Sequence, residues 1–351
     1  MTIQPGPDNC WRLGGDGPSP AECHIASGVG DVTIAAIIPL YNKRRTVLEA
    51  IESVIAQTRP VDEIVIVDDA STDGSFEEVA QRYGGDRRFR LLRHRHNLGV
   101  SAARNNAIRS TRCELLAFLD ADDRWLPERI EKHAAVMGAK PSCMLAWSAH
   151  IIHNEATNVT RVEGERIDKD TYLCSTFFRE KLLPASGGVT VRRKALDVVG
   201  MFDESLWMGE DTDLWLRIML RFGFEHIPQP LVWMRRGRQV SIPSMERGFV
   251  GNDRYFAKHR YTFGRGLRGQ VIWRRAYSSV LRRHASWYFR NGMGLKAMIS
   301  ILKSVAVWPL FDSTITFKYA LEYALGTATY TRAVALMRQL VRRGKSEGRH
   351  V

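Results

Sequence analysis

The chain has 351 residues, of which 44% are hydrophobic and 25% are charged, and this mixture excludes a wholly disordered protein. Its formal net charge of +13 is unevenly placed, because residues 254–351 hold 19 lysines and arginines against 3 acidic residues, whereas residues 1–253 hold 32 against 35. We therefore expect two regions with different electrostatic properties. The five cysteines are scattered without a CxxC pair, which argues against a disulfide framework and a zinc knuckle and favours the cytoplasm.

Residues 1–31 are rich in Pro, Gly and Asp and lack a basic segment followed by an apolar run. We interpret them as a flexible leader rather than a signal peptide. No segment reaches the roughly 18 uninterrupted apolar residues that a membrane-spanning helix needs, and residues 298–311 are interrupted by Lys303 and Pro309. Integral insertion is therefore disfavoured, whereas peripheral attachment to the inner face of the plasma membrane stays open.

From Thr33 onward, short β-rich runs alternate with helical patterns, and this alternation predicts βαβ units and a parallel sheet. The runs IAAIIP, EIVIV and LLAFL are apolar on both faces, as expected for strands covered by helices on each side. The expected strands are residues 33–40, 63–67, 89–93 and 114–119, and the expected helices are residues 45–57, 75–83 and 99–110.

After Pro141 the alternation fades into a mixed sheet. The expected strands there are residues 143–153, 158–162, 188–192 and 224–234, with a helix at 211–222. Beyond Met245 the pattern is helical and basic, with helices at 268–289, 295–307 and 319–343. The predicted fold class is α/β, with a mostly parallel central sheet in a domain at 32–240 and a basic, mainly helical region at 241–351.

Ligands of such sheets gather beyond the carboxyl ends of the strands, and three acidic motifs follow expected strands or open a helix. In FLDADD, Asp120 and Asp122 end a strand, where two carboxylates and diphosphate oxygens can share one Mg²⁺ or Mn²⁺. The alternative is a solvated acidic loop that caps the helix opening at Pro127.

In IVIVDDASTDGS, Asp68 and Asp69 follow a buried strand and are well placed to accept hydrogen bonds from a base or ribose. Asp73 and Ser71 can also cap the next helix. In GEDTDLWLR, Glu210 and Asp211 open a helix, where a carboxylate could act as general base. The alternative there is an acidic helix N-terminus favoured by the helix dipole.

In this order, the motifs resemble the family-2 glycosyltransferases of the GT-A fold, a Rossmann-like nucleotide-diphospho-sugar transferase fold. The resemblance covers about residues 33–236, and it rests on the segments IPLYNKRRTVLEAIESVIAQT, VDEIVIVDDASTDGS, HNLGVSAARNNAI, LAFLDADDRWLPERI and GEDTDLWLRI. It implies an enzyme that moves a hexosyl or N-acetylhexosaminyl group from a nucleotide-diphosphate sugar, with UDP-sugar favoured, to a carbohydrate or lipid-linked acceptor hydroxyl. The setting would be synthesis of a bacterial surface polysaccharide, lipopolysaccharide or glycolipid.

The resemblance also implies roles for individual residues. Asp211 would be the catalytic base with Glu210 beside it, and Asp122 with Asp120 would hold Mg²⁺ or Mn²⁺. The nucleotide pocket would be formed by Pro39, Tyr41, Asn42, Asp68, Asp69, Arg104 and Asp120. The segment 186–190 is similar to the loop below the donor sugar. No QxxRW motif follows the expected base, which favours single addition, by an inverting displacement, over a processive polymerase.

Other interpretations remain. A nucleotidyltransferase would show a Gly-rich phosphate loop and a dehydrogenase would show GxGxxG, and the loop IPLYNKRRT contains no glycine. A non-catalytic carbohydrate- or nucleotide-binding protein would be expected to lose one of the acidic positions. Within residues 268–290, arginines alternate with aromatic residues, which suits an anionic membrane surface or equally a face packed on the catalytic domain. Nucleic acid is not expected.

Overall fold

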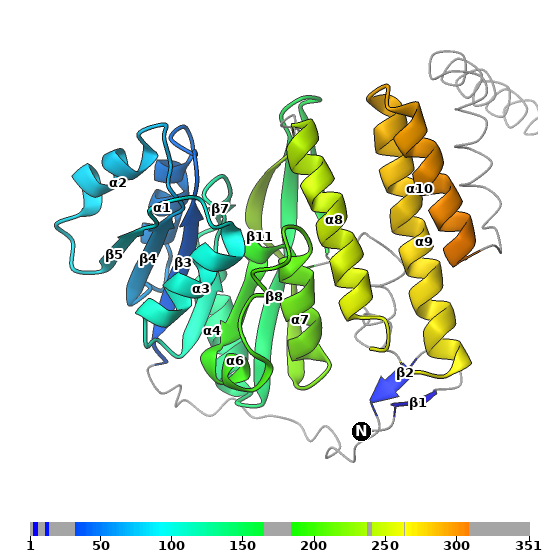
Figure 1. The fold of residues 1–351 in the computed structure, drawn as a ribbon. Helices are drawn as coiled ribbons and strands as arrows, with labels where there is room; N and C mark the ends of the chain where they lie inside the picture. Colours follow the sequence, from blue (N-terminus) through cyan, green and yellow to red (C-terminus); the bar gives the residue numbers. More distant parts are fainter. Residues whose placement is uncertain are drawn as a thin grey trace, which may run out of the picture. The chain divides into compact units, whose positions relative to one another are not determined.

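The computed structural model describes residues 3–5, 11–13, 32–164, 184–236, 241–262 and 264–308. It divides into two compact units, Met1–Tyr255 and Phe256–Val351, which we describe separately (Figure 1). The first unit includes the early part of helix α8, so this division falls later in the chain than the boundary at residue 240 that the sequence predicts.

The first unit is built on a nine-stranded mixed sheet in the order β5-β4-β3-β6-β10-β8-β11-β7, with β9 paired to β8. The strands β5, β4, β3 and β6 are parallel neighbours, β10 runs antiparallel between β6 and β8, and β8 and β11 are parallel. The strands are β3 (Ile34–Leu40), β4 (Glu63–Asp68), β5 (Phe89–Arg93), β6 (Leu115–Phe118), β7 (Arg124–Trp125), β8 (Cys143–Asn154), β9 (Val159–Glu163), β10 (Val189–Arg192) and β11 (Gly223–Arg236).

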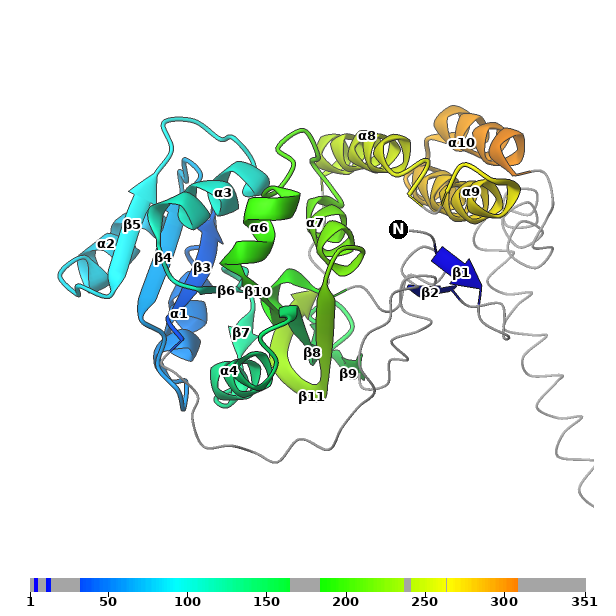
Figure 2. The same cartoon turned by 90° about the horizontal axis from the view of Figure 1, so that it is seen from below.

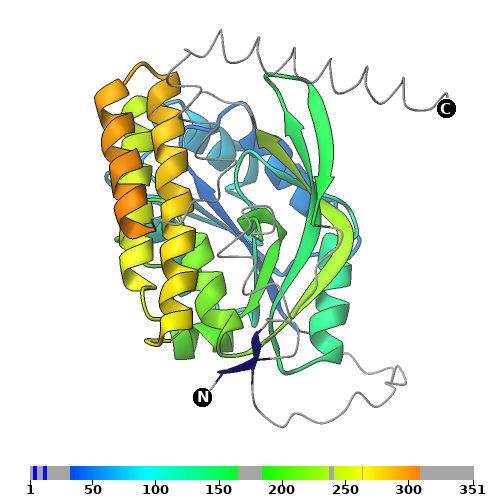
Figure 3. The ribbon, with the colours of Figure 1, turned by 90° about the vertical axis from the view of Figure 1, so that its right-hand side faces the viewer.

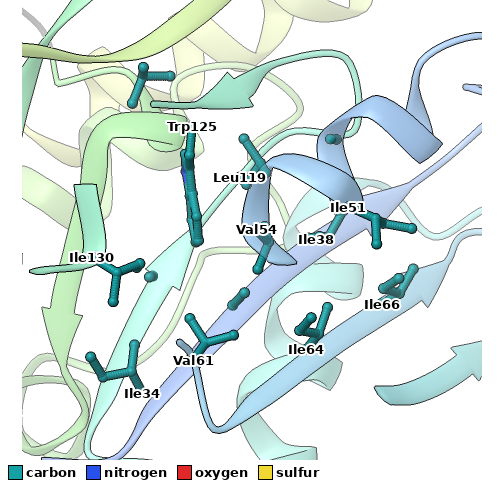
Figure 4. Close-up of a cluster of buried hydrophobic side chains, with 14 of the residues drawn as sticks. Ile34, Ile38, Ile51, Val54, Val61, Ile64, Ile66, Leu119, Trp125 and Ile130 are labelled. Atoms are coloured by element: carbon teal, nitrogen blue, oxygen red, sulfur yellow. The ribbon is translucent and has the colours of Figure 1, made fainter. Parts of the chain in front are cut away.

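Helices cover both faces of this sheet, which makes three layers (Figure 2). Side chains alternate along a strand, so Ile34, Ile38 and Leu40 of β3 pack toward α1, α2 and α4, whereas Ala35 and Ile37 pack toward α3, α6 and α7. Figure 4 shows the first of these two apolar clusters. The helices are α1 (Val47–Ile55), α2 (Ser75–Tyr83), α3 (Val100–Ser110), α4 (Arg129–Ala139), α6 (Arg193–Val199), α7 (Glu210–Met219) and α8 (Ile242–Lys258).

The predicted fold class is confirmed, since the strands and helices of residues 33–119 lie where the alternating pattern places them. Burial on both faces explains why β3 and the central residues of β4 are apolar. The two-residue strand β7 and the short helix α6 were not predicted, because neither is long enough to show a period. In the leader, β1 (Ile3–Pro5) and β2 (Trp11–Leu13) pair antiparallel, which the composition gave no reason to expect.

In the second unit, α9 (Leu267–Arg290) and α10 (Gly294–Val307) lie side by side (Figure 3). Ser278 of α9 donates to the carbonyl of Ser304 at 3.0 Å. Phe256 stacks on Tyr277, and Trp273 packs against both rings. Two of the three predicted C-terminal helices are thus confirmed, and the helix predicted at 319–343 lies outside the described residues. No helix in the described part of the chain is long and apolar enough to cross a membrane.

Candidate active site

A cavity of about 750 Å³ lies where loops follow the carboxyl ends of β3, β4 and β6. Five residues that the sequence predicts for the site line it: Pro39, Tyr41, Asp69, Asp120 and Asp122. The loop before α3 together with the first turn of α3, the loop before α7 and the start of α8 complete the wall. From these three segments come Asn97, Leu98, Gly99, Val100, Ser101, Ala103, Glu204, Leu206, Trp207, Ser244 and Arg247.

Asp69 connects the end of β4 to the wall of the cavity. Its Oδ1 accepts hydrogen bonds from the backbone N–H of Leu98 and from His94 Nδ1, and its Oδ2 accepts one from the backbone N–H of Gly99, each at 2.8 Å. Each carboxylate oxygen has two lone pairs, so Oδ2, with one hydrogen bond from the protein, retains an acceptor position. Asp69 therefore fixes the loop before α3 and can still accept an N–H from a ligand.

Asn42 and Asp68 lie behind this wall and hold two loops together. Asn42 has a left-handed backbone (φ 50°); its N–H donates to Ser71 Oγ at 2.9 Å, and its Oδ1 accepts the N–H of Thr72 at 2.8 Å. Asp68 is fully buried and pairs with Arg93 Nε at 3.0 Å. Neither is among the described residues that line the cavity, so both are placed to shape the loops.

Arg104 is a buried arginine of α3 that joins two of the predicted acidic motifs. Its Nη2 donates to Asp120 Oδ1 at 2.8 Å and its Nη1 donates to Glu210 Oε1 at 2.9 Å. Burial opposes its charge, but the carboxylates of Asp120, Glu210 and Asp211 outweigh that effect and raise the pKa of Arg104. One guanidinium thus balances three carboxylates from two loops, without being among the described lining residues.

The acidic motif after β6 divides its carboxylates between the cavity and the core. Asp120 and Asp122 face the cavity, and Asp122 also pairs with Lys43. Asp123 is 1% exposed and accepts the N–H of Arg235 at 3.1 Å. Burial, with the neighbouring charges of Asp120 and Asp122, raises its pKa well above the ordinary value. Asp123 therefore supports the loop, whereas Asp120 and Asp122 are the carboxylates of this motif that line the cavity.

These two carboxylates suit a cation that arrives with phosphate oxygens. Within the residues that the structure describes, no group of three or more His, Cys, Asp or Glu side chains could hold a metal ion by itself. Mg²⁺ is usually bound through one or two carboxylates plus substrate phosphates and water. Asp120 and Asp122 therefore fit a divalent cation shared with a diphosphate better than a closed protein site.

Glu210 and Asp211 open α7 next to this cluster. Asp211 Oδ2 accepts a hydrogen bond from Ser186 Oγ at 3.1 Å, and Oδ1 accepts the N–H of Thr212. Ser186 belongs to the short helix η1 (Ser186–Gly188), where a side chain at Gly187 would come within 3.3 Å of Val232. This close packing holds the donor to Asp211 in place. Glu210 and Asp211 are not among the described residues that line the cavity.

Burial and the neighbouring charge of Asp211 raise the pKa of Glu210 to about 7, although Arg104 opposes the shift. The folded state therefore binds a proton on Glu210 more tightly than the unfolded state, in which the pKa of a glutamate is 4.5. The protonated Glu210 thus adds to the stability of the fold. This contribution is fully present below pH 4.5 and is lost as the pH rises through about 7.

Since glutamine cannot ionise, Glu210→Gln should gain stability relative to the wild type by roughly 2–3 kcal/mol between pH 4.5 and 7.5. Urea unfolding at both pH values measures this difference. Asp197→Asn, at an exposed carboxylate of α6, is the control. Equal pH dependence in the wild type and Glu210→Gln would contradict the raised pKa.

Lys43, Trp207 and Arg247 are among the lining residues that the sequence did not assign to the site. Lys43 lies in the loop IPLYNKRRT, which was considered only for its lack of glycine, and neither Trp207 nor Arg247 was given a role. Lys43 follows the predicted pair Tyr41 and Asn42, so its position in the same loop was an available signal. Arg247 lies beyond the region of resemblance, and no pattern around it points to the cavity.

Comparisons with known proteins agree with this geometry. Residues 35–200 match the model of glycosyl transferase family 2. This segment is therefore similar to family-2 glycosyltransferases. A chain of the S. aureus protein TarS, residues 1–349, solved in complex with UDP-GlcNAc, has a similar fold with a TM-score of 0.51 and 16% identity, covering 77% of this chain and 90% of that one. The predicted GT-A fold is therefore confirmed.

The sequence relatives match only part of this chain. A putative teichuronic acid biosynthesis glycosyltransferase of Bacillus subtilis is 33% identical over 33% of this chain and 46% of its own length. The amylovoran biosynthesis glycosyltransferase AmsE of Erwinia amylovora is 28% identical over 59% of this chain and 77% of its own. This chain therefore spans less than half the length of the first of these relatives.

Proposed function

We propose that this protein transfers a sugar from a nucleotide-diphosphate sugar, with a UDP-sugar as the first candidate, to an acceptor hydroxyl in the synthesis of a bacterial surface polysaccharide. The supporting observation is that one cavity brings together Tyr41, Asp69 and the pair Asp120 and Asp122 from three different strand ends. Supporting relatives include the enzymes of teichuronic acid and amylovoran synthesis and the TarS chain that binds UDP-GlcNAc.

The donor would bind with its base between Tyr41 and the loop before α3. The Tyr41 side chain is 46% exposed and offers a ring face for stacking. The remaining lone pair of Asp69 Oδ2 is suited to accept an N–H of the base. Asp120 and Asp122 would hold Mg²⁺ or Mn²⁺, which, when bound, neutralises charge on the departing diphosphate.

The transfer would be a single displacement with inversion at the anomeric carbon. Asp211 takes the proton of the attacking hydroxyl, and the hydrogen bond from Ser186 orients its carboxylate. Glu210, with its pKa near 7, shares the positive charge of Arg104 and so sets the electrostatic field around Asp211. In this scheme no covalent intermediate with the protein is needed.

The activity can be tested without knowing the acceptor, because water can replace it. Purified protein is incubated with UDP-, GDP- and dTDP-sugars and Mn²⁺, and the released nucleoside diphosphate is measured. We expect slow release from one donor class, with the first-formed free sugar from an α-linked donor in the β configuration by NMR. Release of the α anomer would reject inversion, and no release from any donor would argue for a non-catalytic binding protein.

The metal assignment makes a separate prediction. Asp122→Asn should weaken Mn²⁺-dependent binding of the nucleoside diphosphate by about 10–100-fold, because the variant loses a charged metal ligand. Binding with EDTA present should change much less. Isothermal titration with and without Mn²⁺ measures both values, and Glu131→Gln on the exposed face of α4 is the control. An unchanged metal-dependent affinity would remove Asp122 from this role.

For the C-terminal unit we propose attachment to an anionic membrane through α10. Leu295, Met298, Ile299 and Leu302 are exposed, and their spacing puts them on one face of the helix. Lys296 and Lys303 are also exposed, which suits an anionic surface. For the arginine- and aromatic-rich residues of α9, the sequence left open both a membrane surface and packing on the catalytic domain; in the structure Trp273 and Tyr277 pack against Phe256.

Replacing both Leu295 and Leu302 by Asp should lower binding to phosphatidylglycerol vesicles about 10-fold or more. The reason is that burying each leucine contributes about 1.5–3 kcal/mol and the new charges repel the surface. Cosedimentation with vesicles measures the loss. Asn291→Asp, at an exposed position in the turn before α10, adds a charge without changing the apolar face. Equal binding by the double variant would reject this surface.

A further inference from the structure

The early part of α8 is packed tightly on the loop that leads into α7. A Cβ at Gly251 would lie 2.7 Å from the backbone nitrogen of Met208, so a side chain there requires the two backbones to separate. Arg254 Nη1 also donates to the carbonyl of Ser205 at 2.9 Å. This contact lies within the first unit, which ends at Tyr255, and it fixes α8 at the edge of the cavity.

This contact places Arg247 of α8 over the ring of Trp207. The guanidinium carbon lies 4.8 Å from the ring centroid, and both residues line the cavity. The ring in turn approaches the start of α3, since a Cβ at Gly99 would be 3.3 Å from it. A stacked guanidinium keeps its N–H groups in its own plane. Stacking on Trp207 therefore orients the guanidinium of Arg247 and leaves its N–H groups able to donate to a ligand in the cavity.

The basic side chains around the cavity differ in whether an acidic side chain pairs with them. Lys43 pairs with Asp122, and Asp120 pairs with Arg104. For Arg247, the described residues provide no ion-pair partner; its recorded contact is with Trp207. An uncompensated guanidinium in a cavity favours an anionic ligand, and its planar donors match two oxygens of a phosphate.

We propose that Arg247 binds the diphosphate of the donor and holds it as it departs, so that α8 forms part of the active site. This assignment rests on the proposed function, because it requires a nucleoside diphosphate in the cavity. Arg247 would contact phosphate oxygens from the side of α8, while Asp120 and Asp122 approach from β6. The close contact of Gly251 with Met208 would be needed to keep Arg247 at the cavity.

The test compares ligands that differ only in their phosphates. Dissociation constants of UDP, GDP and dTDP, and of uridine, guanosine and thymidine, are measured by isothermal titration for the wild type, Arg247→Ala, Arg247→Lys and Gly251→Leu. For the diphosphate that binds the wild type, Arg247→Ala should lose about 10-fold or more in affinity, with the nucleoside unchanged. Arg247→Lys should recover part of the loss, and Gly251→Leu should resemble Arg247→Ala.

The outcomes separate this inference from the proposed function. Arg221→Ala, at an exposed arginine just beyond α7, controls for the loss of one positive charge. If the wild type binds a diphosphate and Arg247→Ala binds it equally well, Arg247 has no such role. Equal weakening of diphosphate and nucleoside would also overturn it, since the loss would then come from the base or from Trp207. If the wild type binds none of the diphosphates, the proposed function fails as well.

Discussion

Asp211→Asn should lower the rate of donor turnover about 10²–10⁴-fold while leaving the affinity for the donor unchanged. Asparagine keeps the shape of the side chain and an oxygen that can accept the N–H of Thr212, but it cannot take a proton from the attacking hydroxyl. General-base catalysis commonly contributes a factor of this size. The readout is released nucleoside diphosphate, together with the dissociation constant of the donor.

The control for this variant is Asp197→Asn, which removes an exposed carboxylate of α6. A second variant, Ser186→Ala, removes the hydrogen bond to Asp211 and should cause a smaller loss of rate, because it disturbs the orientation of the base and not its chemistry. Turnover by Asp211→Asn at the wild-type rate would exclude Asp211 as the base.

Arg104→Met should destabilise the fold by about 3–5 kcal/mol. Methionine fills much of the same space, but it leaves Glu210 and Asp120 without the guanidinium that pairs with both. Removing one partner of a buried ion pair has a cost of this order, because the carboxylate left behind either keeps a buried charge or must take up a proton. Glu210 would respond with a still higher pKa, since Arg104 is the group that opposes its shift.

Urea unfolding at pH 7 measures this loss. Arg109→Met is the matched control, because Arg109 lies on the same helix with a side chain that is 57% exposed and only a 3.8 Å contact to Glu204. It should change the free energy of unfolding by less than about 0.5 kcal/mol. Arg104→Lys keeps the positive charge but loses the two guanidinium nitrogens that pair with Glu210 and Asp120. Its loss of stability should therefore be smaller than that of Arg104→Met and larger than that of Arg109→Met. A loss below about 1 kcal/mol for Arg104→Met would contradict the account of the cluster.

The sequence predicted most of the first half of the sheet because its strands are buried on both faces. Residues 75–83 and 89–93, for example, are a helix and a strand with the predicted bounds. Short or irregular elements such as α6 and β7 could not be predicted, because a period is visible only over several turns or residues. The sequence groups the start of α8 with the C-terminal region, whereas in the structure it packs on Met208 of the first unit. Such a contact between residues far apart in the sequence leaves no local pattern from which it could be predicted.

For the site, the sequence located the acidic residues, but it did not show which of them line the cavity and which are buried in ion pairs. Asp68 and Asp69 are adjacent, yet Asp68 is buried against Arg93, while Asp69 lines the cavity. This difference follows from the alternation of side chains at the end of β4. The pairing of Arg104 with Asp120 and Glu210 joins residues 16 and 106 positions apart, and only the fold brings them together.

The most direct test of the central claim is the melting temperature of the wild-type protein with UDP, GDP, dTDP and CMP, each with and without Mn²⁺. A ligand that binds the native state stabilises it by about 2.7 kcal/mol at 100 times its dissociation constant. The melting temperature should rise with one nucleoside diphosphate, with UDP as the first candidate, and this rise should depend on Mn²⁺. No rise with any nucleotide under either condition would contradict a nucleotide-sugar site in this cavity.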